Sequence, residues 1–318
     1  MLLAILAVSL WGFGCDGGGG QTTPDESDDL GTSGSEGPRV ASEVPRGLND
    51  TRWRWLEAHC TEGPLDLSSR GYAAELTVMQ DDSSGAVTLI TDQTFSAESC
   101  ANTVVVDGAP PSSGPDWQMQ EVARIAVPAT PECYGRPEDL RPGTVRRAGQ
   151  LLEVLVQRSR WCNGLEVRMV YAPMNDEPLG EDQIVRHYAA LFTVGNAPAV
   201  ASLFAETGTL LEPFTRTDTG DPYRHIGRAS VEEWYSETFQ SAPWRAMRIT
   251  DITSAETESG AASRTMSWEY MDPRLAEPLA GSTSFTIAAG EIFEAQIELR
   301  GEPTLRPAEE PEGETQGG

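Results

Sequence analysis

Apolar and polar residues alternate with a period of two over much of the N-terminal half of the chain. Two alternating runs within residues 72–95 are joined by a polar turn, a pattern typical of a β-hairpin. Residues 116–127 alternate again, and residues 149–173 contain a second hairpin with Asn163-Gly164 as its tight-turn pair. The period therefore predicts antiparallel strands throughout this region.

Tryptophan residues lead into these hairpins. In residues 51–60, Trp53 and Trp55 stand two positions apart, so a strand would point both side chains to the same face. We expect about six to eight strands in residues 50–174, which predicts an all-β antiparallel barrel or sandwich. An opening strand with tryptophan followed by a meander is similar to lipocalin-like domains. The tryptophans are expected to fill the core rather than to contact a ligand.

The hydrophobic period changes after residues 173–182, a linker rich in proline and acidic residues. Residues 181–196 have the 3.6-residue period of a helix, with Gly195-Asn196 as the stop signal. One face of this helix would carry Ile184, Tyr188, Leu191 and Phe192. Such a face predicts packing of the helix against another layer of the fold.

The remaining elements complete a second domain. Residues 197–208 predict a second helix ended by Gly208, residues 209–214 a short strand, and residues 227–239 a third helix with Ser230 as N-cap. Three strand patterns follow, two of them interrupted by turn-like stretches: residues 244–257, 262–273 and 281–300. Helices first and strands afterwards predict an α+β cone with a curved antiparallel sheet around the helices. The expected fold class is thus two domains.

The composition narrows the function classes. The 318-residue chain is 39% hydrophobic, enough for a real core, and carries a formal charge of -26. Nucleic acids and anionic membrane surfaces require a basic footprint on the protein, so the acidity argues against both as partners. The sequence contains no Ser/His/Asp motif, P-loop or dinucleotide fingerprint, and we expect no cofactor.

The N-terminus predicts export. Residues 2–14 form an apolar run too short to span a bilayer, which stops at Cys15 before a run of glycines. The pattern resembles a bacterial lipoprotein signal, although Phe13 departs from the usual lipobox and a positive n-region is missing; an ordinary secretory signal is the alternative. The resemblance implies a cell-envelope protein anchored to a membrane by lipid on Cys15. Residues 16–49 and 301–318 have the composition of a disordered tether and a disordered acidic tail.

Four further cysteines occur in the chain: Cys60, Cys100, Cys133 and Cys162. An even number in an exported protein predicts two disulfides, with three possible connectivities. Cys60 and Cys162 both lie beside tryptophan-bearing strand patterns, so we favour the pairs Cys60–Cys162 and Cys100–Cys133. Zinc is the alternative, but no two cysteines have C-x-x-C spacing and only His59 lies beside one. We expect no metal site.

The second domain carries a family resemblance in its motifs. "IVRHYAALFTVGNAPAVASLFAETGTLLEP", then "GRASVEEWYSETF" and "SRTMSWEY", follow a frame of helix, Gly-Asn turn, helix, short strand and proline. This frame resembles the nuclear-transport-factor-2-like (NTF2-like) superfamily, which includes steroid Δ-isomerases and SnoaL-type polyketide cyclases. The resemblance covers residues 181–300 and implies the cone fold, which hosts enzymes, binding modules and scaffolds.

The resemblance also implies roles for individual residues. In steroid isomerases the acid just before the proline of this frame is the general base, and the resemblance implies that role for Glu212. A tyrosine of the first helix donates a hydrogen bond to the developing enolate in these enzymes, and the resemblance implies that role for Tyr188. Tyr235 matches a supporting tyrosine of the third helix. The second donor of these enzymes is a neutral carboxylic acid. That position falls on or near Thr283, a weaker donor, so the oxyanion hole is incomplete.

Glu212 is the main candidate for a functional residue in this domain. A carboxylate at the mouth of an apolar cone would be desolvated and its pKa raised, as proton abstraction requires. The alternative is that Glu212 only marks a strand end, with its head group in water or paired to Arg216 or Arg224. His225, in the loop before the third helix, is a further candidate acid or base, whereas His187 should face away from the pocket.

The residues expected to line the pocket are Tyr188, Leu191, Phe192, Leu211, Trp234, Tyr235, Trp268, Thr283 and Phe285. The preferred function is non-catalytic: a small-ligand-binding or interaction module of a cell-envelope lipoprotein, with a small apolar ligand. The alternative is an isomerase, lyase or cyclase that acts on a cyclic carbonyl substrate, with Glu212 as general base and Tyr188 as oxyanion donor. Pairing through the open face of the sheet is common in the superfamily, so a homodimer is a further hypothesis.

Overall fold

The computed structural model describes residues 51–80, 87–95, 100–109, 117–127, 142–174, 178–216, 220–241, 246–256 and 261–306. The predicted signal with Cys15, the tether of residues 16–49 and Cys133 lie outside these ranges, and the predictions about them stay predictions. No helix in the described part of the chain is long and apolar enough to cross a bilayer.

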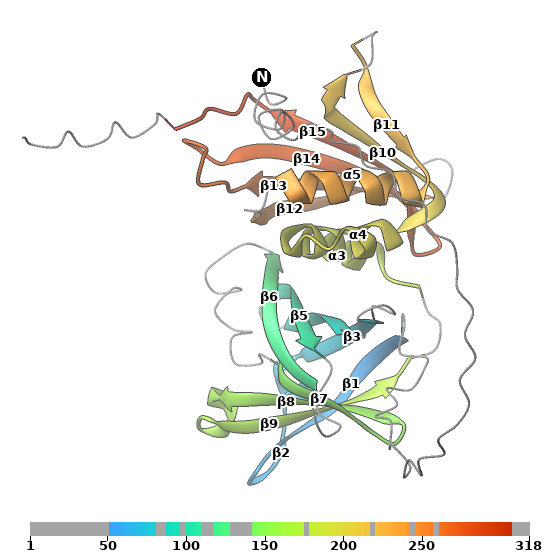
Figure 1. The fold of residues 1–318 in the computed structure, drawn as a ribbon. Coiled ribbons are helices and arrows are strands. Elements are labelled where there is room, and N and C mark those ends of the chain that lie inside the picture. Colours follow the sequence, from blue (N-terminus) through green and yellow to red (C-terminus); the bar gives the residue numbers. More distant parts are fainter. Residues whose placement is uncertain are drawn as a thin grey trace, which may run out of the picture.

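The N-terminal strands form a closed barrel (Figure 1). The elements are β1 (Thr51–Cys60), β2 (Gly63–Leu65), η1 (Ser68–Arg70), β3 (Tyr72–Gln80), β4 (Val87–Phe95), β5 (Cys100–Ala109), β6 (Trp117–Val127), β7 (Pro142–Ala148), β8 (Leu151–Ser159), η4 (Arg160–Cys162) and β9 (Leu165–Pro173). Short β2 only extends β1, and the other eight strands of the nine-stranded sheet close into a ring through pairing of β1 with β9. Because the ring is closed, the sequence prediction of an antiparallel barrel is confirmed and the sandwich is excluded.

Alternation along the strands fills the barrel interior, as the sequence predicts. Trp53 is 3% exposed in the interior cluster, and Trp55 packs against the same cluster. The second hairpin turns at Asn163 and Gly164, whose φ angles of 55° and 81° lie in the left-handed region that these residue types tolerate. The pair predicted to form the tight turn therefore does so.

A disulfide closes one end of the barrel. Cys60 at the end of β1 is bonded to Cys162 in η4, with 5.5 Å between their Cα atoms and 102 positions between them in the sequence. This predicted pair is confirmed. Cys100 is also disulfide-bonded, but its predicted partner Cys133 lies outside the described residues, so that pairing stays a prediction.

Helices and a second sheet form the rest of the structure. The elements are α3 (Glu181–Val194), α4 (Ala197–Ser202), β10 (Phe204–Arg216), β11 (Pro222–Ile226), α5 (Arg228–Ser241), β12 (Met247–Glu256), β13 (Ala262–Tyr270), β14 (Leu279–Ala288) and β15 (Glu291–Arg300). The strand order is β11-β10-β15-β14-β13-β12. The prediction of an antiparallel sheet is wrong at one pair, because β10 and β15 run parallel where the first and last parts of the domain meet. The sheet is mixed.

Two local predictions in this region are also wrong. The second helix ends at Ser202 rather than Gly208, because fully buried Phe204 already belongs to β10 and pairs with Ile292. Gly208 lies inside β10, where its backbone is close to β15 and a Cβ atom would meet the Ile292 carbonyl oxygen at 2.8 Å. Helix α5 begins at Arg228, so Ser230 lies inside the helix and is not its N-cap.

Helix α3 lies between the barrel and the second sheet (Figure 1). One hydrophobic cluster includes Ile90 and Val105 from the barrel's outer face and Val185 from α3. Residues 184–191 are all buried, where the sequence predicts a single apolar face. Two contacting layers account for this, because each buries its own side of the helix.

The polar side of α3 is anchored to the barrel by a buried carboxylate. The Oδ2 atom of Asp92 lies 2.5 Å from His187 Nε2, its Oδ1 atom lies 3.5 Å from an Arg186 Nη, and the Thr103 hydroxyl donates to Oδ1. Burial acts to raise the pKa of Asp92, but these neighbours outweigh burial and lower it. His187 therefore faces the barrel, away from the cavity described next, as predicted.

Candidate functional site

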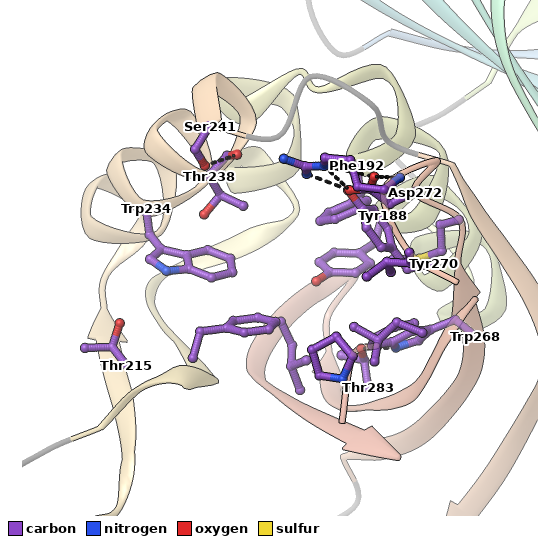
Figure 2. A pocket seen from close by; sticks show the side chains of 17 residues that line it. Tyr188, Phe192, Thr215, Trp234, Thr238, Ser241, Trp268, Tyr270, Asp272 and Thr283 are labelled. Carbon is purple, nitrogen blue, oxygen red and sulfur yellow. Dashed lines mark hydrogen bonds and ion pairs between the residues drawn. The ribbon is translucent and has the colours of Figure 1, made fainter. Parts of the chain in front are cut away.

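A cavity of about 180 Å³ lies inside the second sheet. Aromatic side chains make up much of its wall: Tyr188, Phe192, Phe214, Trp234, Trp268 and Tyr270. Figure 2 shows Trp234 and Thr215 on one side of the space and Trp268, Tyr270 and Thr283 on the other. The cavity is thus a gap between facing layers of the fold, shaped by aromatic rings.

Regular spacings bring these residues together. Tyr188 and Phe192 are one helical turn apart on α3, and Trp234, Thr238 and Ser241 follow one face of α5 at i, i+4 and i+7. On β13 the lining residues alternate, as expected for one face of a strand. The helical spacing on α5 was a signal in the sequence for Thr238 and Ser241, which our prediction missed.

A buried pair of phenols lies at the wall, with Tyr188 in the lining and Tyr235 behind it. The hydroxyl oxygens of Tyr188 and Tyr235 lie 2.5 Å apart, and both side chains are at most 1% exposed. Burial raises the pKa of Tyr188 to about 12, against a smaller opposing effect of the hydrogen bond from Tyr235. Both hydroxyls are therefore protonated at neutral pH, and the pair adds a polar but uncharged spot to the wall.

Thr283 has a different role from the one implied by the resemblance. Its hydroxyl oxygen accepts a hydrogen bond from Trp268 Nε1 at 2.9 Å. This contact fixes the indole ring against the cavity and leaves the threonine hydroxyl hydrogen able to donate to a ligand. Trp268 and Thr283 line the cavity together, as predicted.

A charged pair lines the cavity next to the loop after β13. The guanidinium of Arg274 binds both carboxylate oxygens of Asp272, at distances between 2.6 and 3.1 Å. Hydrogen bonds from Arg274 hold the pKa of Asp272 below its ordinary value. The two charges neutralise each other. Sequence reasoning missed this pair, because a loop has no period that reveals which side chains turn inward.

Residues 301–306 pack over the same loop. Leu275 and Leu305 form a β-bridge, the Ala276 N–H donates to the Thr304 carbonyl at 2.8 Å, and Pro303 lines the cavity. The cavity is therefore bounded on this side by two short chain segments instead of a sheet strand.

Glu212 is not among the residues that line the cavity, and its carboxylate points to the backbone. It accepts hydrogen bonds from the N–H groups of Phe214 at 2.5 Å and Thr215 at 2.9 and 3.1 Å. These residues lie in a break of the β10–β11 register, between the pairs formed by Glu212 and Arg216. Glu212 thus satisfies N–H groups that the ladder leaves without a partner, and it positions Phe214 and Thr215 in the cavity wall.

The pKa of Glu212 shifts in the direction opposite to the one expected from the sequence. Burial acts to raise the pKa of its carboxyl, but the neighbouring His225 side chain and hydrogen bonds from Thr215 and Phe214 outweigh burial and lower the pKa. The expected raised pKa is wrong. The alternative expectation, a carboxylate in water or paired to Arg216 or Arg224, is also wrong. Glu212 is fully buried, and backbone N–H groups bind its carboxylate.

His225 is placed beside Glu212 by the β10–β11 pairing. Its Nε2 atom lies 3.8 Å from Glu212 Oε1, and its ring packs between Tyr223 and Trp234 with centroid distances of 4.9 and 5.6 Å. Trp234 thus separates His225 from the space that the indole lines. The structure brings the predicted acid and base candidates together with each other, behind the cavity wall.

The other predicted pocket residues lie in or beside the core. Leu191, Tyr235 and Phe285 are at most 1% exposed and pack behind the lining, where the Phe285 ring contacts that of Tyr188 at 5.1 Å. Leu211 is half-buried on β10. The residues that the structure does place in the lining are Tyr188, Phe192, Trp234, Trp268 and Thr283.

Comparisons with known proteins find partial structural similarity only. The chain matches no protein-family model. No curated protein matches it either. A SnoaL-like protein from Burkholderia thailandensis is 15% identical over 39% of this chain and 100% of its own, with a TM-score of 0.32. A protein with a ketosteroid isomerase-like fold from Catenulispora acidiphila, solved with trimethylamine, is 20% identical over 36% and 83%, with a TM-score of 0.28.

The orange carotenoid protein of Anabaena, solved with canthaxanthin, is 16% identical over 40% of this chain, with a TM-score of 0.31. The match spans only 38% of the length of that protein. At these TM-scores the similarities identify neither a family nor an activity for the chain.

Proposed function

We propose that residues 178–306 form an NTF2-like module that binds one small, neutral, ring-bearing ligand without transforming it. The observation that carries the proposal is the aromatic-walled cavity of about 180 Å³. Concave apolar sites with a few convergent polar groups are the usual form of small-molecule sites in proteins. The order of helices and strands around the cavity agrees with the frame on which the sequence resemblance rests.

The volume sets the size of the ligand. An engineered apolar cavity of about 150 Å³ holds one benzene molecule, so about 180 Å³ suits a single ring with one or two small substituents. A four-ring steroid exceeds this space. The module therefore favours a monocyclic ligand.

The polar groups of the wall set the charge of the ligand. Asp272 and Arg274 are paired to each other, and the other polar lining groups named above are uncharged hydroxyl and indole groups. A charged ligand buried here would have to break that pair or remain without a counter-charge, which is unfavourable. A neutral ring with one hydroxyl or carbonyl group can instead bond to Thr283 while its ring packs on Trp234 and Trp268.

The catalytic alternative receives less support from the site. An isomerase or cyclase mechanism needs Glu212 and Tyr188 to open into one cavity, with the carboxylate able to take a proton. Tyr188 lines the cavity, whereas the Glu212 carboxylate is occupied by backbone N–H groups and its pKa is lowered. We therefore favour binding over catalysis.

Titration of the full chain with para-cresol tests the proposal. Quenching of tryptophan fluorescence should report binding, because Trp234 and Trp268 both line the cavity. An eight-atom ligand at about 0.7 kcal/mol per atom would bind with a Kd of roughly 10–200 μM. Thr238→Phe should abolish binding by filling the space, and Glu237→Phe, on the exposed side of the same helix, is the matched control.

Two results would overturn the proposal. One is the absence of saturable quenching by para-cresol in a folded wild-type chain. The other is equal affinity in the wild type and in Thr238→Phe, which would place the ligand outside this cavity.

We also propose that the chain is exported and lipid-anchored in the cell envelope, on the strength of the N-terminal sequence alone. The test is fractionation of cells that express the full chain. The wild type should sediment with membranes and Cys15→Ser should not; a variant that still sediments with membranes would refute lipidation at this residue.

A further inference from the structure

The interior of the barrel is not uniformly apolar. On β4, Leu89 belongs to the interior cluster, so Thr91 and Gln93 point inward by alternation along the strand. On β5, Val104 belongs to the same cluster, so Asn102 points inward too. These polar side chains are fully buried, at 2%, 2% and 0% exposure. Polar side chains thus interrupt the apolar filling along two neighbouring strands.

The inward polar groups meet across the strands. Gln93 and Asn102 are direct cross-strand partners, and Thr91 is one inward position further along β4. Trp55 on β1, two strands from β4 in the sheet, packs against the interior cluster, and its indole contacts the Tyr72 ring edge to face at a centroid distance of 5.0 Å. Four uncharged polar side chains therefore lie on the interior side of the barrel.

Five of the six polar atoms of these side chains have no hydrogen-bond partner among the residues that the structure describes. Both amide atoms of Asn102, the Oε1 atom of Gln93, the Oγ1 atom of Thr91 and Nε1 of Trp55 are buried without a hydrogen bond. Burying such a group without a partner is unfavourable relative to an apolar replacement, and native interiors contain few of them. Five unpartnered atoms on the interior side of the barrel indicate a site that is completed by another molecule.

The neighbouring side chains at this level are small. Gln93 pairs with Ala74 on β3, and Asn102 pairs with Ala126 on β6, so an alanine flanks the two amides on each side. Both alanines are at most 3% exposed. Small residues beside unpartnered amides leave those amides free to bond to a compact guest molecule.

The donor set defines the chemistry of the guest. Asn102 offers an acceptor and a donor in one plane, Gln93 an acceptor, and Trp55 a donor. A primary amide or lactam presents the complementary pair of acceptor and donor in one plane, and it carries no charge that would need burial. The aromatic rings of Trp55 and Tyr72 suit the flat face of such a group.

We propose that the barrel interior contains a second binding site, distinct from the cavity of the second sheet, for a small neutral amide or lactam. Asn102 and Gln93 bind its amide group, and Trp55 donates to its carbonyl. This site does not depend on the ligand-binding role of residues 178–306.

Binding of 2-pyrrolidinone, a small five-membered lactam, tests the proposal. The full chain with Thr238→Phe is used, so that the cavity of the second sheet is filled, and affinity is measured by ligand-observed NMR after overnight incubation. Asn102→Leu keeps the side-chain volume but removes both partners, so we expect a loss of roughly tenfold or more in affinity. Thr94→Val, an exposed position on β4, is the matched control and should bind like the parent.

A crystal of the full chain soaked in 2-pyrrolidinone gives the second readout. Ring-shaped density beside Asn102 supports the site. Ordered water alone beside Asn102, no NMR-detected binding, or equal affinity in Asn102→Leu overturns it. If Asn102→Leu does not fold, Gln93→Leu is measured by the same two criteria.

Discussion

Replacing Glu212 with glutamine tests whether this residue positions the cavity wall or acts as a base. The structure gives its carboxylate a local task, because it accepts the N–H groups of Phe214 and Thr215 that the β10–β11 ladder leaves without a partner. In Glu212→Gln one oxygen remains to accept and the other becomes an amide that cannot. We therefore expect a folded but less stable protein.

The size of the effect follows from the contacts. Hydrogen bonds to a charged group are worth about 1.5–3 kcal/mol each, against about 1 kcal/mol for neutral ones. With its oxygen in the place of Oε2, the amide keeps the contacts to both N–H groups as weaker neutral hydrogen bonds and loses the third contact, from Thr215 to Oε1, so we expect a loss of about 2–4 kcal/mol in the free energy of unfolding at pH 7. Glu206→Gln on the same strand is the matched control. Its side chain is 80% exposed and pairs with Arg228 at the surface, so it should change stability by less than about 1 kcal/mol.

Urea unfolding at several pH values is the assay. Because the pKa of Glu212 is lowered in the folded state, its contribution is fully present above the unfolded pKa of about 4.3 and is lost as pH falls through the folded value. The wild type and Glu212→Gln should therefore differ most near neutral pH and converge below about pH 4. A difference that grows on acidification, or one below about 0.5 kcal/mol at pH 7, would refute the positioning role.

Three further predictions concern the junction, the disulfide and the cavity. Asp92→Asn leaves the buried Arg186 guanidinium without its counter-charge and removes the carboxylate that contacts His187, so it should cost about 3–5 kcal/mol in urea unfolding; a loss below about 1 kcal/mol would contradict the account. Replacing both Cys60 and Cys162 with serine opens a loop of 102 residues and should destabilise the chain by about 4–5 kcal/mol, so an unchanged Tm would contradict it. Because the pKa of Tyr188 is raised to about 12, para-cresol affinity should be constant between about pH 6 and pH 9, and a titration in that range would assign the phenol a different state.

The sequence predicts the fold correctly where an element has a periodic pattern and buries only one of its faces. Alternation is enough to predict an antiparallel barrel or sandwich, and the strand patterns beside Cys60 and Cys162 favour the pair that the structure contains. Helix α3 shows the limit of such reasoning. Its period predicts one apolar face, but two layers bury it, so the buried contact of His187 with Asp92 depends on a neighbour 95 positions away that no local pattern reveals.

In the site, too, local sequence spacing predicts some residues, whereas others depend on contacts between elements that are distant in the sequence. Tyr188, Phe192 and Trp234 were predictable because helical spacing sets which side chains share a face. The orientation of Glu212 was not, because it depends on a break in register between β10 and β11. That break turns the carboxylate toward its own backbone and reverses the expected direction of its pKa.

A crystal structure of the full chain grown with para-cresol tests the central claim most directly. The account predicts ring-shaped density between Trp234 and Trp268, with the ligand hydroxyl within hydrogen-bond distance of Thr283. Para-cresol bound elsewhere on the molecule while this cavity holds only water, in a crystal where Trp234 and Trp268 keep their positions, would contradict the account.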